Sequence, residues 1–391
     1  MISPPMVSRN VSLITSASTV RGLGYSSIWI YSSLYIHEVL KISLFYDGII
    51  FTAGGFLAAF VNIYGGAISD RVGHKETMIF SYSMAVVIYA VISFVPGVAL
   101  SALLYPAAFI MFMIANAVQS PASNALLSKS SDVQLKGFSI LRVGNNIGWG
   151  FGPAIGGFIE SYSGYHFLFV FGLLMGIISL GISLFLHNVK DDGRRSRPAL
   201  STSNTWLIEL SMIALLLFIV QAQETVTLTN YATIIRSLKV YDLGFVYLTN
   251  GIFVTVSQGF IYKITRRIGN YVSFALGSFI YSFGFFSYAF DTNLFGMIIS
   301  TIVLTVGEDF AFPVGYSMVS AVSKPENIGK NMGIYNAFLS IGRAIGPTIG
   351  GAAFTFFPNP YELWLFTTIT GFISCFLFIV RFRKVESLKH V

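Results

Sequence analysis

The sequence predicts an all-α integral membrane protein with twelve transmembrane helices, arranged as two pseudo-symmetric bundles of six. The first observation is composition: of 391 residues, 54% are hydrophobic and only 10% are charged, whereas soluble domains carry about 25% charged residues. The second is that apolar runs of about 20 residues, long enough to cross a bilayer, recur from end to end. The third is a glycine and proline pattern that occurs once in each half of the chain.

The apolar runs are expected to be helices, because only a helix satisfies its own backbone hydrogen bonds over such a length in lipid. Their expected boundaries are residues 12–36, 44–64, 78–95, 100–125, 137–160, 164–187, 205–230, 241–262, 270–290, 294–320, 332–356 and 361–380. One longer polar stretch separates the sixth run from the seventh. We therefore expect a six-helix bundle over residues 1–188, a cytoplasmic linker over residues 189–204 and a second bundle over residues 205–391.

Lys and Arg set the expected orientation of the chain. Most of the 24 basic residues fall in alternate segments between the runs, whereas the other segments hold only Lys41, Arg236 and Lys239. By the positive-inside rule the basic segments are cytoplasmic, so we expect a multi-pass protein of the cell membrane with both termini in the cytoplasm. The net charge of +7 is then explained by topology, and we expect no nucleic-acid partner.

The chain contains an internal repeat. GWGFGPAIGG at residues 148–157 returns as GRAIGPTIGG at residues 342–351, and DRVG at residues 70–73 returns as RRIG at residues 266–269. The positions shared by the longer pair, 194 residues apart, are Gly148, Gly152, Pro153, Gly156 and Gly157, and Gly342, Gly346, Pro347, Gly350 and Gly351. Two homologous halves follow from these landmarks. Glycines four residues apart permit close helix packing and proline bends a helix. Packing alone explains one such face, but its recurrence favours a pair of hinge helices.

The loop after the second run carries a motif of five residues. The matching residues are Gly66, Asp70, Arg71, Gly73 and Lys75. This motif resembles the signature of the major facilitator superfamily of secondary transporters, and the six-plus-six layout extends the resemblance over the whole chain. The glycine–proline pattern of the fifth run resembles the motif of the drug:proton antiporter branch. That branch often has an Arg in the fourth run, where this chain has Asn116.

The resemblance implies that the loop is a latch, which closes the cytoplasmic side of the protein in one state and opens in the other. Gly66 and Gly73 would let helix ends approach closely, and Asp70 would accept hydrogen bonds from the N-terminus of a facing helix. The alternative interpretation is that Arg71 and Lys75 only fix the topology. The complete spacing of the motif favours the latch.

Few ionisable side chains fall inside the apolar runs, where a charge costs about 2.5–3.5 kcal/mol on insertion scales and normally faces a cavity. With one amide added, the candidate substrate and coupling residues are Arg21, Asn116, Glu224, Glu308, Asp309 and Arg343. Arg142 lies near the cytoplasmic end of the fifth run, and both gating and interfacial anchoring remain open for it. We expect Arg343 to pair with a carboxylate of the tenth run. Because Asn116 occupies the Glu308 position in the repeat, Glu308 is the expected cavity residue and Asp309 the expected brace.

These features predict a secondary transporter that moves a small molecule by alternating access. The resemblance favours proton-coupled export of a drug or metabolite. Proton-coupled uptake and uniport remain open, as does a sensor built on a transporter fold. No nucleotide-binding, hydrolase or metalloprotease motif occurs, and Cys375 is the only cysteine, so we expect no enzyme activity, metal or cofactor. The expected partners are a small-molecule substrate, protons and the lipid bilayer, and the expected state is a monomer.

Overall fold

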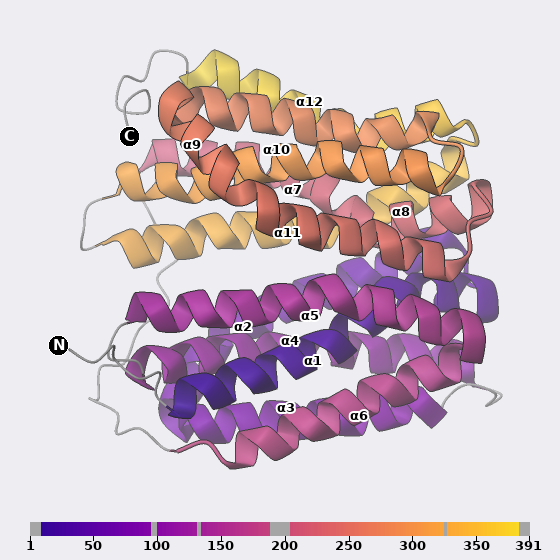
Figure 1. Ribbon diagram of the computed structural model, residues 1–391, viewed down its shortest axis with the longest axis vertical. Coiled ribbons are helices and arrows are strands. Elements are labelled where there is room, and N and C mark those ends of the chain that lie inside the picture. The colour runs from indigo at the N-terminus through magenta and orange to yellow at the C-terminus, as the bar shows by residue number, and fades with distance from the viewer. Residues whose placement is uncertain (1–8, 95–99, 131–133, 188–203, 324–326, 383–391) are drawn as a thin grey trace. The chain divides into compact units, whose positions relative to one another are not determined.

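The computed structural model describes residues 9–94, 100–130, 134–187, 204–323 and 327–382. In these ranges the chain forms helices joined by short connections, with no strand (Figure 1). The expected all-α class is therefore confirmed. Eight helices within the same ranges are long and apolar enough to cross a membrane.

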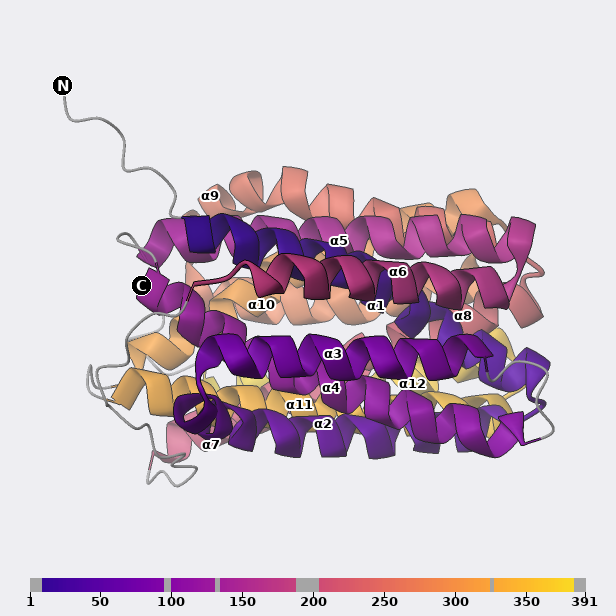
Figure 2. The same cartoon turned by 90° about the horizontal axis from the view of Figure 1, so that it is seen from below.

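The chain divides into two compact units. Unit 1 comprises residues 1–40 and 56–198, and unit 2 comprises residues 41–55 and 199–391. The helices of the first half of the chain are α1 (Arg9–Leu34), the π-helical turn η1 (Tyr35–Val39), α2 (Leu44–Val72), α3 (His74–Phe94), α4 (Ser101–Ser130), α5 (Gln134–Ser163) and α6 (Tyr165–Leu184). Figure 2 shows α1, α3, α5 and α6 running lengthwise as long rods.

The second half of the chain holds a matching series of helices. They are α7 (Thr205–Gln221), the 3₁₀ turn η2 (Ala222–Glu224), α8 (Val226–Asn230), the π-helical turn η3 (Tyr231–Ile235), α9 (Val240–Ser287), the 3₁₀ turn η4 (Tyr288–Phe290), α10 (Leu294–Ala321), α11 (Ile328–Phe356) and α12 (Pro360–Phe382). Gly269 has φ 82° and ψ 162°, which is not helical, so α9 consists of two helical segments that meet at a kink.

The two halves repeat the same packing. α1 packs against α5 and α6 as α7 packs against α11 and α12, and α3 packs against α4 and α6 as α9 packs against α10 and α12. Gly73, with φ 111°, separates α2 from α3, and 196 residues later Gly269 kinks α9. The π-helical turns η1 and η3 are also 196 residues apart. The repeat read from the sequence is therefore present in the backbone.

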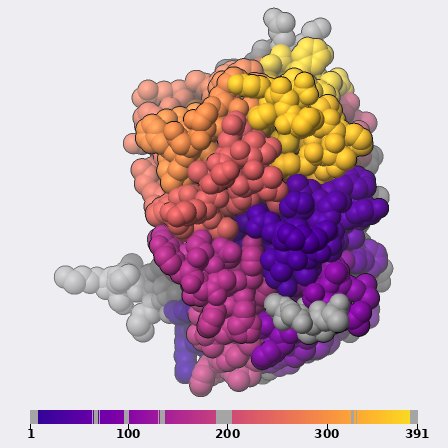
Figure 3. Space-filling model, turned by 90° about the vertical axis from the view of Figure 1, so that its right-hand side faces the viewer, coloured from indigo at the N-terminus to yellow at the C-terminus, as the bar shows by residue number. Residues whose placement is uncertain are grey.

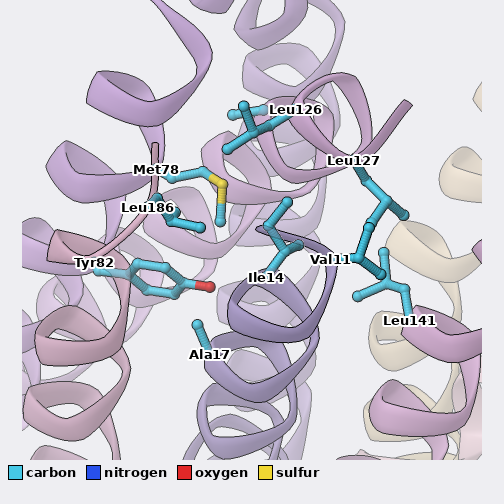
Figure 4. Close-up of a cluster of buried hydrophobic side chains, with 10 residues drawn as sticks. Val11, Ile14, Ala17, Met78, Tyr82, Leu126, Leu127, Leu141 and Leu186 are labelled. Atoms are coloured by element: carbon cyan, nitrogen blue, oxygen red, sulfur yellow. The ribbon is translucent and has the colours of Figure 1, made fainter. Parts of the chain in front are cut away.

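A cluster of buried apolar side chains holds one end of α1 within unit 1 (Figure 4). Val11 and Ile14 of α1 are 2% and 0% exposed. The side chains around them come from α3, α4, α5 and the residues after α6, namely Met78, Tyr82, Leu126, Leu127, Leu141 and Leu186. Because lipid is as apolar as these side chains, close van der Waals contact holds such helices together.

Large apolar side chains are exposed along helices that carry no internal charge. On α3, Phe80, Val87 and Phe94 are 62%, 63% and 71% exposed and recur every seven residues, so they lie on one face. Similar exposed apolar residues lie along α6, α12 and the second segment of α9. Figure 3 shows one face of the molecule, on which the surface atoms of neighbouring helices within each unit lie against one another. Exposed faces of this kind are typical of contact with lipid.

Candidate functional site

The expected continuous helix over residues 205–230 is wrong at one point, because the helix is interrupted at Glu224. α7 ends, the turn η2 holds Glu224, and α8 then resumes the helix. Thr225 Oγ1 donates to the carbonyl oxygen of Ala222 at 3.0 Å, and threonine hydroxyls compete in this way with regular helical hydrogen bonds. At the corresponding positions 26–28, α1 is continuous, so the interruption is found in the second half alone.

Side chains from two other helices stabilise the interruption. The backbone oxygen of Glu224 accepts hydrogen bonds from Tyr247 Oη of α9 at 2.5 Å and from Thr229 Oγ1 at 3.2 Å. The fully buried Gln223 holds the same turn on α11, because its Nε2 donates to the Gly346 oxygen at 3.1 Å. In lipid a freed backbone group requires such partners. The half-buried side chain of Glu224 is therefore presented from a break in the helix whose freed carbonyl has hydrogen-bond partners.

Two neighbouring carboxylates on α10 have separate partners on α9. Glu308 accepts a hydrogen bond at 3.1 Å from Asn250 Nδ2, which also lies 2.9 Å from Thr305 Oγ1. Asp309 is 6% exposed and accepts a hydrogen bond from Ser257 Oγ. Asn250 and Ser257 are seven residues apart, so they lie on one face of α9. Glu308 is half-buried and is the more accessible of the two acids.

Arg343 of α11 has neutral contacts. Its Nε donates to Gln221 Oε1 at 2.9 Å, and its guanidinium carbon lies 4.5 Å from the centre of the Phe218 ring. The expected direct pair with a carboxylate of α10 is not formed among the described residues, because the end of α7 supplies an amide to the guanidinium instead. Arg343 still acts electrostatically on Glu224 and Glu308, and these two acids act on each other.

In unit 1 the structure brings together two of the predicted site residues, Arg21 of α1 and Asn116 of α4. Arg21 Nη1 donates to Asn116 Oδ1. Asn116 Nδ2 donates to the Phe112 oxygen at 2.8 Å, and this bond leaves the amide oxygen for the arginine. The ring centre of Tyr25, one helical turn further on, lies 5.7 Å from the guanidinium carbon. Unit 1 thus has an amide facing an arginine where the repeat has Glu308 in unit 2.

The glycine faces of α5 and α11 lie directly against α1 and α7. A Cβ atom at Gly148 would lie 3.0 Å from the Thr19 oxygen, and one at Gly342 would lie 2.5 Å from the Leu215 oxygen, 196 residues after Thr19. The same crowding is found at Gly152, Gly156, Gly346 and Gly350. Pro153 and Pro347 lie inside helices that continue past them. Close packing accounts for these glycines, and a hinge role for them stays a prediction.

The predicted latch residues lie where α2 meets α3. Gly73 forms the turn, and its φ of 111° is a conformation that favours glycine. Arg71 is exposed and Lys75 is half-buried. Gly66 and Asp70 lie in the last turns of α2, but the surroundings of these two residues fall outside what the structure describes, so the latch stays a prediction. Arg142, for which gating and anchoring were both open, is exposed near the start of α5.

Comparison with known proteins identifies the family of the chain. The family model described as Major Facilitator Superfamily matches residues 14–290 and 213–390. The chain belongs to the Major Facilitator Superfamily. A superfamily relative, the uncharacterized transporter YqjV of Bacillus subtilis, is 24% identical over 92% of this chain and 90% of its own length. The quinolone resistance protein NorA of Staphylococcus aureus is 22% identical, covering 78% of this chain and 80% of its own. The solved nucleoside transporter NupG superposes with a TM-score of 0.79 at 15% identity, covering 96% of this chain and 99% of its own, and shows the superfamily fold.

Membership of the Major Facilitator Superfamily makes this chain a multi-pass membrane transporter of a small molecule and not an enzyme. Several residues that build the site of this superfamily member were not singled out by the sequence, namely Gln221, Gln223, Tyr247, Asn250 and Ser257. A signal existed for four of them. The two glutamines lie in QAQETVTLTN, a polar patch inside an apolar run, and Asn250 and Ser257 are polar residues at helical spacing in the next run.

Proposed function

We propose that this superfamily member is a proton-coupled secondary transporter that exports a drug-like molecule or metabolite by alternating access. The observation that carries the proposal is the group formed by Glu224, Glu308 and Arg343 around the interrupted helix. In a group of one arginine and two acids inside a membrane protein, binding of a single proton to one of the acids changes the net charge of the group. The glycine–proline motif and the similarity to a quinolone resistance protein favour export as the direction.

The neutral partner of Arg343 explains how a proton would be linked to movement. The guanidinium is hydrogen-bonded to the amide of Gln221, and a carboxylate is a stronger acceptor than an amide. Loss of a proton from Glu224 or Glu308 therefore draws Arg343 toward that acid, and protonation releases it. Because the backbone around Glu224 already lacks regular helical hydrogen bonds, it shifts at a lower cost than an intact helix.

The proposed topology has twelve spans in bundles over residues 1–188 and 205–391, with both termini cytoplasmic in the cell membrane and a monomer as the working unit. Three long helices beyond the eight most apolar ones (α1, α5 and α11), together with the kink at Gly269, support this number of spans. Apart from Asn204, the proposed cytoplasmic linker over residues 189–204 lies outside the described residues. Asn204 Oδ1 caps α7 by accepting from the Leu207 amide at 3.3 Å.

The test uses the purified protein in proteoliposomes with a quinolone as the first probe. Uptake driven by an imposed pH gradient is compared with counterflow, in which labelled and unlabelled probe exchange without a gradient. We expect Glu308→Gln to abolish gradient-driven uptake and to retain exchange. Asp309→Asn is the matched control, because it neutralises the neighbouring acid on the same helix, and it should lower stability but keep the response to the gradient.

Two outcomes would contradict the proposal at different points. A full response of Glu308→Gln to the gradient would place the coupling site elsewhere, and Glu224→Gln would be measured next in the same liposomes. If the wild-type protein exchanges the probe but does not respond to a pH gradient of either sign, the result would contradict proton coupling and favour uniport.

A further inference from the structure

Arg21 lies near the middle of its helix. It follows the start of α1 at Arg9 by twelve residues and precedes its end at Leu34 by thirteen, which places it about 18–20 Å from either end at 1.5 Å per residue. The hydrocarbon core of a bilayer is about 30 Å thick, so the guanidinium lies too deep to be solvated from either surface. A cation at such a depth requires a partner of opposite charge or an accessible polar face.

The partners of Arg21 in the described part of unit 1 carry no charge. Nη1 donates to the amide oxygen of Asn116, and the ring of Tyr25 lies alongside. Nε is buried and has no hydrogen-bond partner among the described residues. The fully buried Tyr89 lies within electrostatic reach of Arg21 and is neutral as well. One buried donor and one positive charge are thus left without an acceptor of negative charge among the described residues.

The contrast with unit 2 shows that this imbalance is specific to unit 1. Arg343 in unit 2 has Glu224 and Glu308 within electrostatic reach. Unit 1 has Asn116 at the position of Glu308, so the acid that would balance Arg21 is replaced by an amide. An anionic molecule bound next to Arg21 would supply the missing negative charge.

An aromatic surface lies next to Arg21. The ring of Tyr25 stacks on Phe112 with centroids 4.7 Å apart, and Trp149 meets Tyr25 edge-on at 5.7 Å. Trp29, one helical turn further along α1, also stacks with Tyr25, with centroids 5.6 Å apart. Trp149 is 44% exposed and Tyr25 is half-buried, so part of this surface is open to a ligand. Aromatic side chains arranged in this way favour a flat apolar ring.

We propose that Arg21 is the recognition site for a carboxylate on an aromatic substrate. The carboxylate accepts charge-assisted hydrogen bonds from the guanidinium of Arg21, and the ring of the substrate packs against Tyr25 and Trp149. This inference rests on the proposed transport function and names its substrate class as aromatic acids. It assigns anion recognition to unit 1 and leaves the proton-coupling acids to unit 2.

The test measures equilibrium binding to the purified full-length protein in detergent, with no gradient. The probes are 2-naphthoate and 2-naphthamide, which share a ring and differ in charge, and the method is titration calorimetry. We expect the wild type to bind the acid at least about tenfold more tightly than the amide, the range of one charge-assisted hydrogen bond. Arg21→Gln should remove this preference by weakening the acid alone.

A second variant keeps the test decisive if Arg21→Gln does not fold. Asn116→Asp supplies an internal carboxylate to Arg21, so it should abolish the preference for naphthoate while leaving the protein folded, as thermal unfolding will show. Glu308→Gln and Arg343→Gln should both retain the preference, and the binding result is therefore independent of proton coupling. Equal affinities for the two probes in the wild type, no binding of either, or a preference that survives in Asn116→Asp would overturn the proposal.

Discussion

A single methyl group at Gly148 should separate α1 from α5. A Cβ atom there would lie 2.9 Å from Gly22 Cα and 3.0 Å from the Thr19 oxygen, whereas non-bonded carbon atoms pack at about 3.5–4.0 Å. Both contacts are with backbone atoms, so no side chain can rotate to relieve them, and the helix itself must move. Overpacking of this kind costs about 1–3 kcal/mol.

The net effect of Gly148→Ala includes an opposing term. Replacing glycine by alanine inside a helix gains about 1 kcal/mol of helix propensity. Gly181→Ala on α6 is the matched control, because a Cβ atom at Gly181 meets nothing within 4 Å. This variant therefore gains helix propensity without an overpacking cost. The gain in helix propensity is common to both variants, so they should differ in unfolding free energy by the overpacking cost alone, about 1–3 kcal/mol, with Gly148→Ala the less stable.

Unfolding of both variants is measured by circular dichroism in one detergent. Loss of helix is the appropriate signal, because Trp149 lies next to the substitution and its fluorescence would change for local reasons. If the two variants unfold at the same denaturant concentration and with the same slope, the close approach of α1 and α5 is not what requires glycine at this position.

Three further predictions concern other parts of the chain. Asp70→Asn should slow turnover without reducing the amount of protein in the membrane, and an unchanged transport rate per molecule would rule out the latch. Tyr247→Phe removes the shorter of the two hydrogen bonds to the Glu224 oxygen, so it should lower stability by about 1 kcal/mol in denaturant titrations. An unchanged unfolding free energy would show that this bond does not stabilise the interruption. Burial raises the pKa of Asp291 above its usual 3.8, against Ser300 and Arg236, which lower it. Ionised Asp291 is thus disfavoured by folding, and the folded state loses stability as pH rises through the raised pKa. Asp291→Asn should increase Tm at pH 7 by an amount that shrinks as the pH falls toward 3.8, and a constant difference would contradict this explanation.

Most helix positions followed from hydropathy, but the ends of the helices did not. The expected run over residues 361–380 matches α12 to within two residues at either end. By contrast, residues 263–269 were expected to form a loop, and α9 continues through them to the kink at Gly269. Hydropathy marks where lipid contact ends, whereas Lys and Arg are good helix formers that extend a helix past that point.

The site could be predicted as a set of charged residues and not as a set of contacts. Glu224, Glu308 and Arg343 were chosen because charges inside apolar runs are rare. Which of them would touch depends on the rotation of α7, α10 and α11 about their axes, and a sequence leaves this rotation undetermined to within a few residues. The amide of Gln221 therefore took the place that was expected for a carboxylate.

The repeat itself explains why only the second half has an interrupted helix. Gln223 and Tyr247 fix the interruption, and 196 residues earlier the corresponding residues are Ser27 and Phe51. A phenylalanine ring has no hydroxyl to satisfy a freed carbonyl, and Ser27 Oγ donates to the Gly24 oxygen of its own helix. An interruption in α1 would leave buried backbone groups without partners, so α1 stays regular while α7 does not. The substitutions that distinguish the halves are thus of two kinds, those that allow the break and those that place acids beside it. Both occur in the second half, which is where the proposed proton-dependent movement would require them to be together.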